Sequence, residues 1–560
     1  MPDNDTAKIL EDAERQGGWT VVRTYLRFSG PGWLQSALTL GGGSLASALF
    51  LGVVGGYSML WVQAGAMIMG VIMLAAIAYV SLSIQESPFE GMRRRINPVL
   101  AWGWILATLA ANMVWSLPQF SLAYGALTEN IAPGLFANAD SMAWKLGVSF
   151  VVLAIVLGVT LLYDSKGIGI KIYESILKIV VGVIVVSFIG VAIKLAFSDE
   201  GLPLGEIFAG FIPNPSLVFK PSAGYQDVLN TIGAGDTRAF WHDLVLGRQR
   251  DVIVAAASAA VGINMTFLLP FSMRAKGWGK SHRGVALFDL STGMVIPFLI
   301  ATSCIVIASG YLFHGKPYEG VLVETEGRLA ISEDPQFSAQ ASEMRQVISQ
   351  RQSAAPLEDG ELKLAAMLLQ RSNAQFATSL ETLVGPGFAH FVFGIGVLGM
   401  ALSSISLLML ISGFVVCELF GYRHGGIQHK LGTLLASTGV LWPLLWTGSS
   451  RAYLAIPTSV IGYTLLPVAF MAFFLMMNSR ELLGENRPRG RSRVVWNTLM
   501  GLSLAITGTA SVFTAGSLSM SIGGAVIPIG KIFLIGFGFA IIAGHFYLRN
   551  KSKRDRGISI

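Results

Sequence analysis

Two stretches of the 560-residue chain combine apolar residues with groups that could bind a small ion or solute. In the first, residues 31–54, three consecutive glycines and a serine at 41–44 interrupt the apolar pattern. Each glycine costs about 1 kcal/mol of helix propensity relative to alanine, so we expect the helix to unwind here and expose backbone groups. Close packing is the alternative explanation, because glycine lets two helices approach closely.

In the second stretch, residues 251–273, Asn264, Thr266 and Pro270 interrupt the apolar run. Proline removes a backbone donor and leaves a carbonyl one turn earlier without its helical partner. In carriers, such free backbone groups line substrate cavities inside the membrane. The predicted binding residues are Gly41, Gly42, Gly43, Ser44, Val261, Asn264, Met265 and Thr266.

A catalytic site would need different residues, and the sequence does not provide them. It contains neither the GxxxxGK[ST] phosphate loop nor the HExxH zinc motif. The two cysteines, Cys304 and Cys417, both lie in apolar stretches, so neither a disulfide framework nor a thiolate metal cluster is expected. We therefore expect no enzyme and no cofactor.

The composition indicates which elements position the candidate residues. The chain is 53% hydrophobic and 13% charged, whereas soluble domains are about 25% charged. Many apolar runs are near 20 residues long, which is enough to cross a hydrocarbon core of about 30 Å as a helix. The sequence therefore predicts an all-α polytopic membrane protein, with the lipid bilayer as its partner. About twelve transmembrane helices are expected, near 31–54, 59–83, 99–124, 143–163, 171–195, 251–273, 284–311, 388–419, 431–449, 453–478, 494–516 and 526–548.

Basic residues orient these helices. Short connections with basic clusters alternate with connections that have almost none, which is typical of cytoplasmic and outer loops respectively. This bias explains the net charge of +7 better than nucleic-acid binding does. We expect a multi-pass protein of a bacterial-type inner (plasma) membrane with both termini cytoplasmic. The predicted regions are a tail at 1–28, helices one to seven in 29–311, an external polar insertion at 312–386 with a helical segment at 343–371, helices eight to twelve in 387–548, and a basic tail at 549–560.

The second interrupted helix is the fifth after the first, as in folds built from an inverted repeat of five helices. At these residues the sequence resembles the Nramp family of proton-coupled divalent-metal transporters. The resemblance implies a five-plus-five inverted-repeat fold like that of amino-acid carriers, with broken helices 1 and 6 and alternating access. The motifs that carry it are Gly30-Pro31-Gly32-Trp33-Leu34, Gly56-Tyr57, 171–174, 210–213, 393–396 with Ser403-Ser404, and Leu466-Pro467.

The chain departs from that family at the site itself. The family's Asp-Pro-Gly-Asn, whose Asp and Asn bind the metal, is matched by residues 41–44, and its Met-Pro-His-Asn by residues 264–267. The match leaves Ser44 and Asn264 as the candidate metal ligands, with no carboxylate at the first interruption. The acidic pair that the family associates with proton movement falls on Ser116 and Gln119, so proton coupling by that route is not expected.

Two classes of substrate remain open. Ser44, Asn264 and freed carbonyls could bind a divalent metal ion that keeps several of its waters, such as Mg²⁺. Backbone amides of the glycine run could instead bind a small organic or anionic solute, because a helix N-terminus favours negative charge. The sequence also leaves open the coupling ion (H⁺ or Na⁺), the direction of transport and the oligomeric state.

The few ionisable residues in the predicted helices are further functional candidates. Glu174 and Lys178 are four residues apart, which favours an ion pair on one helix face. Asp289 lies near the inner end of the seventh helix, where we expect a cap or an ion pair. The candidates for coupling or gating are Ser116, Gln119, Glu174, Lys178 and Asp289.

Overall fold

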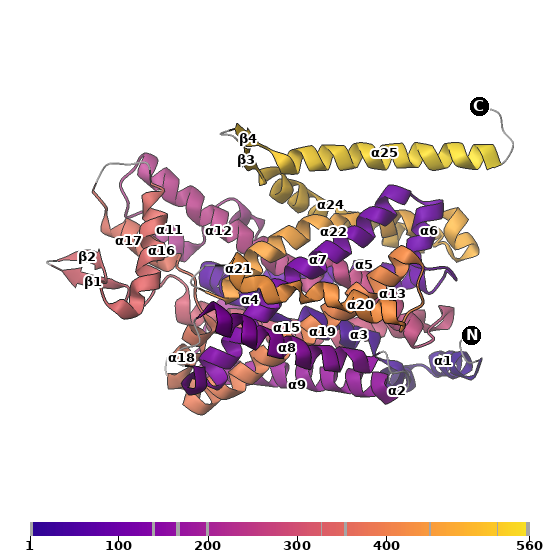
Figure 1. The fold of residues 1–560 in the computed structure, drawn as a ribbon, viewed down its shortest axis with the longest axis horizontal. Coiled ribbons are helices and arrows are strands. Elements are labelled where there is room, and N and C mark those ends of the chain that lie inside the picture. Colours follow the sequence, from indigo (N-terminus) through magenta and orange to yellow (C-terminus); the bar gives the residue numbers. More distant parts are fainter. Residues whose placement is uncertain are drawn as a thin grey trace.

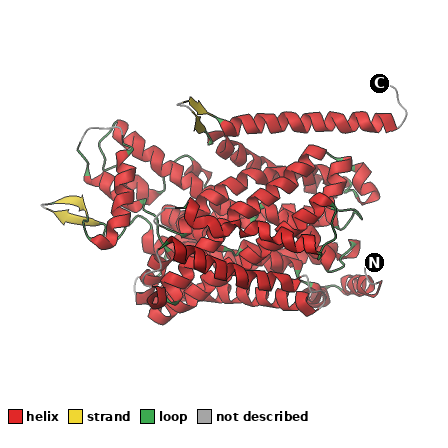
Figure 2. Cartoon of the chain, viewed as in Figure 1, coloured by secondary structure: helices red, strands yellow, loops and turns green. Residues whose placement is uncertain are grey.

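The computed structural model describes residues 4–136, 141–163, 168–197, 201–325, 327–351, 356–446, 450–522 and 525–555. These residues are mostly helical, with two short antiparallel hairpins (Figure 2). Ten helical stretches among them are long and apolar enough to cross a membrane. The predicted all-α polytopic class is therefore confirmed.

The helices vary widely in length, and the longest form the bundle in Figure 1. The first half contains α1 (Asn4–Gln16), α2 (Gly18–Phe28), α3 (Pro31–Thr39), α4 (Gly42–Gly55), α5 (Leu60–Ser81), α6 (Pro88–Arg95), α7 (Pro98–Gly125), α8 (Met142–Tyr163), α9 (Ile168–Ala196), α10 (Leu204–Ala209), α11 (Ala223–Leu229), α12 (Asp236–Ala260) and α13 (Ile263–Ala275). The second half contains α14 (Arg283–Leu290), α15 (Ile296–Phe313), α16 (Ser338–Ser349), α17 (Asp359–Met367), α18 (Asn373–Val384), α19 (Phe393–Phe420), α20 (Ile427–Thr433), α21 (Trp442–Leu445), α22 (Ala455–Asn478), α23 (Arg480–Leu483), α24 (Gly490–Ser517) and α25 (Ile529–Asp555). The strands are β1 (Leu322–Thr325), β2 (Arg328–Ile331), β3 (Met520–Ile522) and β4 (Ala525–Ile527).

The structure has ten membrane-length stretches where about twelve helices were expected, for two local reasons. α4 and α5 continue into each other through the short helix η1 (Gly56–Met59), so two predicted helices form the single stretch Gly42–Ser81. The predicted helix at 431–449 is divided among α20, the 3-10 segment η9 (Leu434–Leu441) and α21. Pro443 stands in the first turn of α21, where its ring cannot continue a preceding helix.

Two membrane helices are discontinuous near their middle. α3 ends at Thr39 and α4 begins at Gly42, as the glycine run predicts. α12 ends at Ala260 and α13 begins at Ile263, so the second break precedes Asn264, Thr266 and Pro270, which all lie inside α13. The predicted position was therefore slightly too late in the chain. Close packing requires glycine at this break, because a Cβ on Gly262 would come within 2.5 Å of the Trp115 ring on α7.

The insertion 312–386, which we call the cap, lies at one end of the molecule beside α11 and the start of α12 (Figure 1). It contains the β1–β2 hairpin and the helices α16, α17 and α18. The segment 343–371, predicted as one helical segment, contains most of α16 and all of α17 as separate helices. α12 begins at Asp236 instead of near residue 251, so the sixth membrane helix extends into the cap. α1 and the end of α25 lie at the opposite end of the molecule (Figure 1).

A buried ion pair within the cap is hydrogen-bonded to α12. The Glu361 side chain on α17 is 0% exposed and accepts hydrogen bonds from Arg351 Nη1, at 2.7 and 2.6 Å, and from Trp241 Nε1, at 2.9 Å. Burial alone would raise the pKa of Glu361. The Glu358 amide, Arg351 and the Trp241 indole outweigh burial and hold that pKa below its ordinary value.

Candidate functional site

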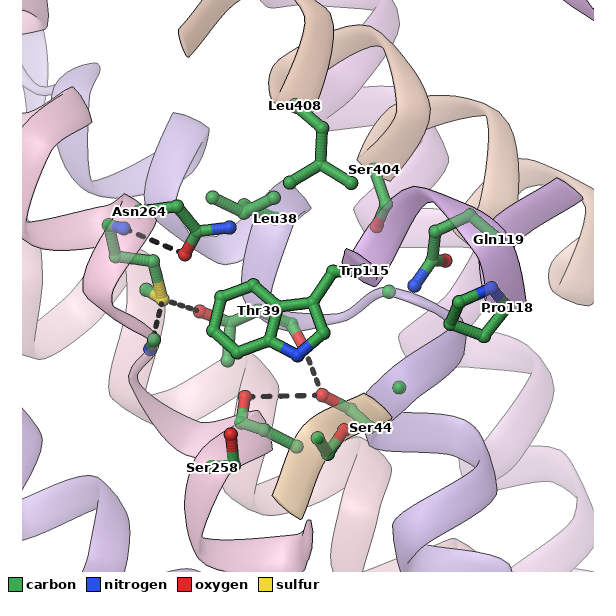
Figure 3. A pocket seen from close by; sticks show the side chains of 16 residues that line it. Leu38, Thr39, Ser44, Trp115, Pro118, Gln119, Ser258, Asn264, Ser404 and Leu408 are labelled. Atoms are coloured by element: carbon green, nitrogen blue, oxygen red, sulfur yellow. Dashed lines mark hydrogen bonds between the residues drawn. The ribbon is translucent and has the colours of Figure 1, made fainter. Parts of the chain in front are cut away.

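The two helix breaks face one cavity of about 50 Å³ inside the bundle (Figure 3). α7, α19 and α22 complete its wall, so five long segments that are far apart in sequence meet there. The lining residues are Leu38, Thr39, Gly41, Gly43, Ser44, Trp115, Pro118, Gln119, Ser258, Ala259, Gly262, Asn264, Met265, Ser404, Leu408 and Ser459.

The first break is held by groups from neighbouring helices. An added Cβ at Gly41 would collide with the Ser404 hydroxyl of α19. The Gly42 amide donates to Gln119 Oε1 on α7 at 2.9 Å. Gly41 has an extended backbone (φ −97°, ψ −178°) that any residue adopts, so its glycine is required for close packing and not for its dihedral angles. Both explanations of the glycine run therefore apply, since the helix unwinds and also packs tightly.

Ser44 links the first break to the second. Its hydroxyl donates to the Thr39 carbonyl, which α3 leaves free at its C-terminal end, and lies 3.4 Å from the Ala259 carbonyl near the end of α12 (Figure 3). Carbonyl oxygens from two half-helix C-termini thus converge on one hydroxyl. Such ends carry partial negative charge.

The second break is satisfied mainly by its own side chains. Met265 Sδ accepts hydrogen bonds from the Gly262 amide and from Thr39 Oγ1, both at 3.4 Å. Asn264 Oδ1 accepts from the Met265 amide at 2.8 Å. Met265 therefore places a thioether between the two breaks (Figure 3), although the family's Met position is occupied here by Asn264.

Two hydroxyl oxygens in the cavity wall have no hydrogen-bond partner among the described residues. They are Ser258 Oγ on α12 and Ser404 Oγ on α19, whose residues are 3% and 2% exposed. A buried hydroxyl without a partner is costly, so such groups usually meet a ligand or water. Neither serine was among the predicted binding residues.

The predicted binding residues divide into two groups. Gly41, Gly43, Ser44, Asn264, Met265 and the coupling candidate Gln119 line the cavity, whereas Gly42 contacts it through its amide partner Gln119. The side chains of two other predicted binding residues, and of the coupling candidate Ser116, point elsewhere. Val261 packs against Gly70 on α5, Thr266 accepts from Trp104 Nε1 at 2.9 Å, and Ser116 donates to the Met113 carbonyl.

Sequence reasoning did not select Thr39, Trp115, Ser258, Ser404 or Ser459 as binding residues, yet all five line the cavity. Thr39 carried a usable signal, because it lies two residues before the glycine run. Ser258 carried one too, since it lies three residues before the second break. The other three lie on unbroken helices, where the sequence alone does not indicate the face.

At the end of the bundle away from the cap, Asp289 holds the N-terminus of α3. Its carboxylate is buried and accepts hydrogen bonds from the amides of Gly30, at 3.1 Å, and Gly32, at 2.6 Å, and from the Ser29 hydroxyl. A carboxylate is favourable here because a helix N-terminus has unpaired donors and partial positive charge. Asp289 thus connects the first half-helix to α14.

Glu174 takes part in the same inner region. Its carboxylate lies 3.1 Å from Lys276 Nζ, just after α13, and that ammonium is 3.4 Å from the Ser29 carbonyl. The expected pairing of Glu174 with Lys178 on its own helix is therefore not what the structure shows. The cross-helix partner is favoured because α13 ends beside α9 and brings a lysine to it.

At the outer end, an aromatic and basic cluster lies above the cavity. Arg248 Nη1 on α12 donates to the Tyr453 hydroxyl at 2.6 Å, and Tyr453 packs edge-on against Phe50 of α4. Residues 367–370 of the cap line a small cavity with the same three side chains. The cap is therefore in contact with the outer halves of both broken helices.

The cavity itself is electrically neutral in its side chains. None of its sixteen lining residues is ionisable. Within the described part of the chain there is also no group of three or more His, Cys, Asp or Glu side chains that could hold a metal ion. Any charged substrate there would be bound by hydroxyl, amide, thioether and backbone groups.

Comparisons with known proteins agree with the fold. A family profile described as natural resistance-associated macrophage protein-like (Nramp) matches residues 32–327 and 363–514. Over 216 residues the chain is 25% identical to the divalent metal cation transporter MntH of Agrobacterium fabrum, a match that covers 38% of this chain and 42% of that relative.

The fold is also similar to crystal structures of the manganese transporter of Eremococcus coleocola. A variant of that transporter has a TM-score of 0.62, and its complex with an aromatic bis-isothiourea substituted compound has a TM-score of 0.61. Both are 15% identical to this chain, and each alignment covers 96% of this chain and 97% of the other.

Proposed function

Since the chain belongs to the Nramp-like family of membrane proteins, we propose that it is a secondary transporter that carries a divalent metal ion, bound with part of its water shell, such as Mg²⁺. On this proposal it is a carrier and not an enzyme. The names of the relatives from Agrobacterium fabrum and Eremococcus coleocola support metal as the class of substrate.

The observation that carries the proposal is how the groups at the two breaks are already paired. Three amides at the two breaks have side-chain partners, because Gly42 donates to Gln119, Gly262 to Met265, and Met265 to Asn264. The oxygens of Ser258 and Ser404 are open. A serine hydroxyl can offer its oxygen to a cation, whereas several of the amides that an anion would need are already paired, so this pairing favours a cation over an organic anion.

The lack of carboxylates favours an ion that stays partly hydrated. An uncompensated divalent charge inside a membrane is costly, and neutral oxygens compensate it only weakly. The cavity of about 50 Å³ has room for about three to five water molecules. Mg²⁺ loses its waters reluctantly and is usually bound through few protein oxygens. Ser258 and Ser404, beside Ser44 and Asn264, are the proposed contacts.

The proposed cycle is alternating access, in which the broken helices move relative to the other helices. Opening to the inside would require α3 to leave Asp289, and would separate Lys276 from Glu174 or carry both along. Opening to the outside would separate Tyr453 from Phe50. A coupling ion, H⁺ or Na⁺, would bind outside the neutral cavity wall. In this orientation the membrane is a bacterial-type inner membrane, the termini are cytoplasmic and the cap is external.

Dication binding by the purified protein tests this proposal. Thermal unfolding would be followed while Mg²⁺, Mn²⁺ or a panel of amino acids and carboxylates is titrated, because a ligand of the folded form stabilises it by RT ln(1 + [L]/Kd). We expect saturable stabilisation by a dication. The double variant Ser258→Ala/Ser404→Ala should raise Kd about tenfold or more, since a hydrogen bond to a charged group contributes about 1.5–3 kcal/mol.

Ser503→Ala is the matched control. Ser503 is equally buried in a membrane helix, α24, and donates to the Leu499 carbonyl away from the cavity. Its loss should leave Kd unchanged. Stabilisation by an organic anion alone, with no response to either dication, would show that the fold serves another substrate.

A further inference from the structure

α25 runs along the outside of the bundle (Figure 1), and a space lies between it and its neighbours. The space has a volume of about 1050 Å³ and is bounded by α7, α22, α24 and α25. That volume is at the upper end of the range for cavities that hold small molecules. α25 also lies beyond residue 514, where the match to the family profile ends. The space is separate from the cavity between the two helix breaks, which we call the ion cavity after its proposed substrate. The two share no lining residue.

Contacts near the two ends of the space and one near its middle fix α25. At the outer end, the Gly530 amide donates to the Leu518 carbonyl at 3.1 Å. At the inner end, Asn97 Nδ2 donates to the Ile541 carbonyl at 2.8 Å. Between them, Phe537 lies so close to Gly103 of α7 that an added Cβ would be 2.9 Å away. The helix is thus anchored at a distance from the bundle, and the space is part of the fold.

It is unfavourable for this space to be empty or to be filled with water. An empty space of this size would deprive its wall of dispersion contacts along its whole length. Its wall is almost entirely apolar, and the hydroxyls of Thr464 and Ser511 already donate to backbone carbonyls at 2.6 and 2.7 Å. Buried water needs two to four polar partners. A hydrocarbon is therefore the occupant that the lining matches.

A helix from a second copy fits less well. A helix with its side chains is about 10–12 Å across, and it would have to enter between α7 and α25 while Asn97 and Gly530 keep α25 in place. The outward side of α25 is exposed and apolar as well, with Phe539 69% exposed. Both sides of this helix therefore suit lipid.

We propose that an acyl chain of a bilayer phospholipid occupies the space between α25 and the bundle as a bound, non-exchanging component of the fold. This lipid would pack beside Pro467, which interrupts the hydrogen bonds of α22. α22 also contributes Ser459 to the ion cavity. Lipid in the space would thus support a helix that lines the ion cavity and that a proline weakens.

Photo-crosslinking of the unmodified protein is the first test. The protein would be reconstituted in phosphatidylethanolamine and phosphatidylglycerol vesicles doped with a phospholipid that carries a diazirine in its acyl chain. We expect adducts on the inward residues Phe533, Phe537 and Leu504 that survive detergent washing and dilution into unlabelled lipid. Adducts on the outward residue Phe539 should disappear on the same dilution. Equal loss from both faces would overturn the proposal.

A pair of glycine variants on α24 is the second test. Gly508 lines the space and Gly501, two turns earlier on the same face, does not, and an added Cβ meets nothing within 4 Å at either position. Gly508→Trp should occupy part of the space and block an acyl chain there. It should lower the phospholipid that stays bound to the detergent-purified protein, measured by native mass spectrometry, by about one molecule. Gly501→Trp should retain it.

The outcomes separate the possible occupants. Equal lipid retention in both variants and in the unmodified protein contradicts the proposal, as does the absence of retained lipid in all three. A crosslink between groove residues of two copies would identify a second copy as the occupant. If Gly508→Trp does not fold, the photo-crosslinking of the unmodified protein still shows whether a lipid chain occupies the space.

Discussion

The cap and the ion cavity both bury polar groups, but they satisfy them in opposite ways. In the cap, Glu361 and Arg351 carry full charges and, with Trp241, form a set of short hydrogen bonds. In the cavity the lining side chains are neutral, and the hydroxyls of Ser258 and Ser404 lack partners among the described residues. In the cap, other protein groups supply the hydrogen-bond partners of the buried ion pair. In the cavity, some polar groups have no protein partner and are open to a ligand.

The difference predicts that the cap stabilises the fold and that the cavity binds substrate. A buried charge pair with all its hydrogen bonds fixes one arrangement of helices, and removing either partner is strongly destabilising. Open hydroxyls around a small volume cost stability until they are occupied. Four changes test this contrast, from the largest expected effect to the smallest.

The largest effect is expected for Glu361→Ala. It leaves the buried Arg351 guanidinium and the Trp241 N–H without their acceptor, which should lower the free energy of opening the cap by about 3–5 kcal/mol. Hydrogen–deuterium exchange of α17 amides measures this opening. Lys363→Ala, on an exposed position of α17, should change it by less than about 0.5 kcal/mol. Equal effects of the two substitutions would contradict a stabilising role for the ion pair.

Acid should weaken the cap through the same carboxylate. The pKa of Glu361 is lowered in the folded protein from an ordinary value of 4.5, so its contribution is complete above pH 4.5 and is lost as the pH falls through the lowered pKa. Each unit of lowering corresponds to about 1.4 kcal/mol. The difference in α17 exchange between unmodified protein and Glu361→Ala should therefore shrink below pH 4.5. A difference that stays constant down to pH 3 would contradict this.

The two glycines that line the first break should respond differently to alanine. At Gly41 the new Cβ collides with Ser404, and overpacking of this kind costs about 1–3 kcal/mol. At Gly43 the nearest atom is Ser459 Oγ at 3.8 Å, so alanine fits and should be neutral or stabilising by up to about 1 kcal/mol. Thermal unfolding in detergent compares the two variants. Equal destabilisation would mean that the unwound backbone, and not close packing, requires glycine at both positions.

The smallest effect is expected for pH on substrate binding. None of the cavity-lining residues is ionisable, so Kd for the dication should change less than about threefold between pH 6 and 8. A carboxylate or histidine ligand in that range would produce up to a tenfold change per pH unit. Isothermal titration at three pH values measures this. A tenfold change would indicate that a titrating group outside the cavity wall is coupled to the site.

Sequence patterns predicted the membrane fold and the first break because both follow from composition. Three glycines in an apolar run are visible without a structure. The second break was misplaced because the residues that suggested it lie inside α13, whereas the break is at Gly262, whose packing against the Trp115 ring on α7 is a tertiary contact. The hydroxyls of Ser258 and Ser404 were missed for a related reason. A serine in a membrane helix usually bonds to its own backbone, as Ser412 does with the Leu408 carbonyl, and only packing shows which one does not.

α1 and the end of α25 both lie at the end of the molecule opposite the cap (Figure 1), which has a consequence for work in living cells. Fluorescent proteins attached to the two termini would stand in the same compartment, and an epitope in the β1–β2 hairpin would stand in the other. A membrane-impermeant dye would therefore stain either the hairpin epitope or both fusions. Intact cells would give the orientation of the molecule from a single staining pattern, without purification or knowledge of its substrate.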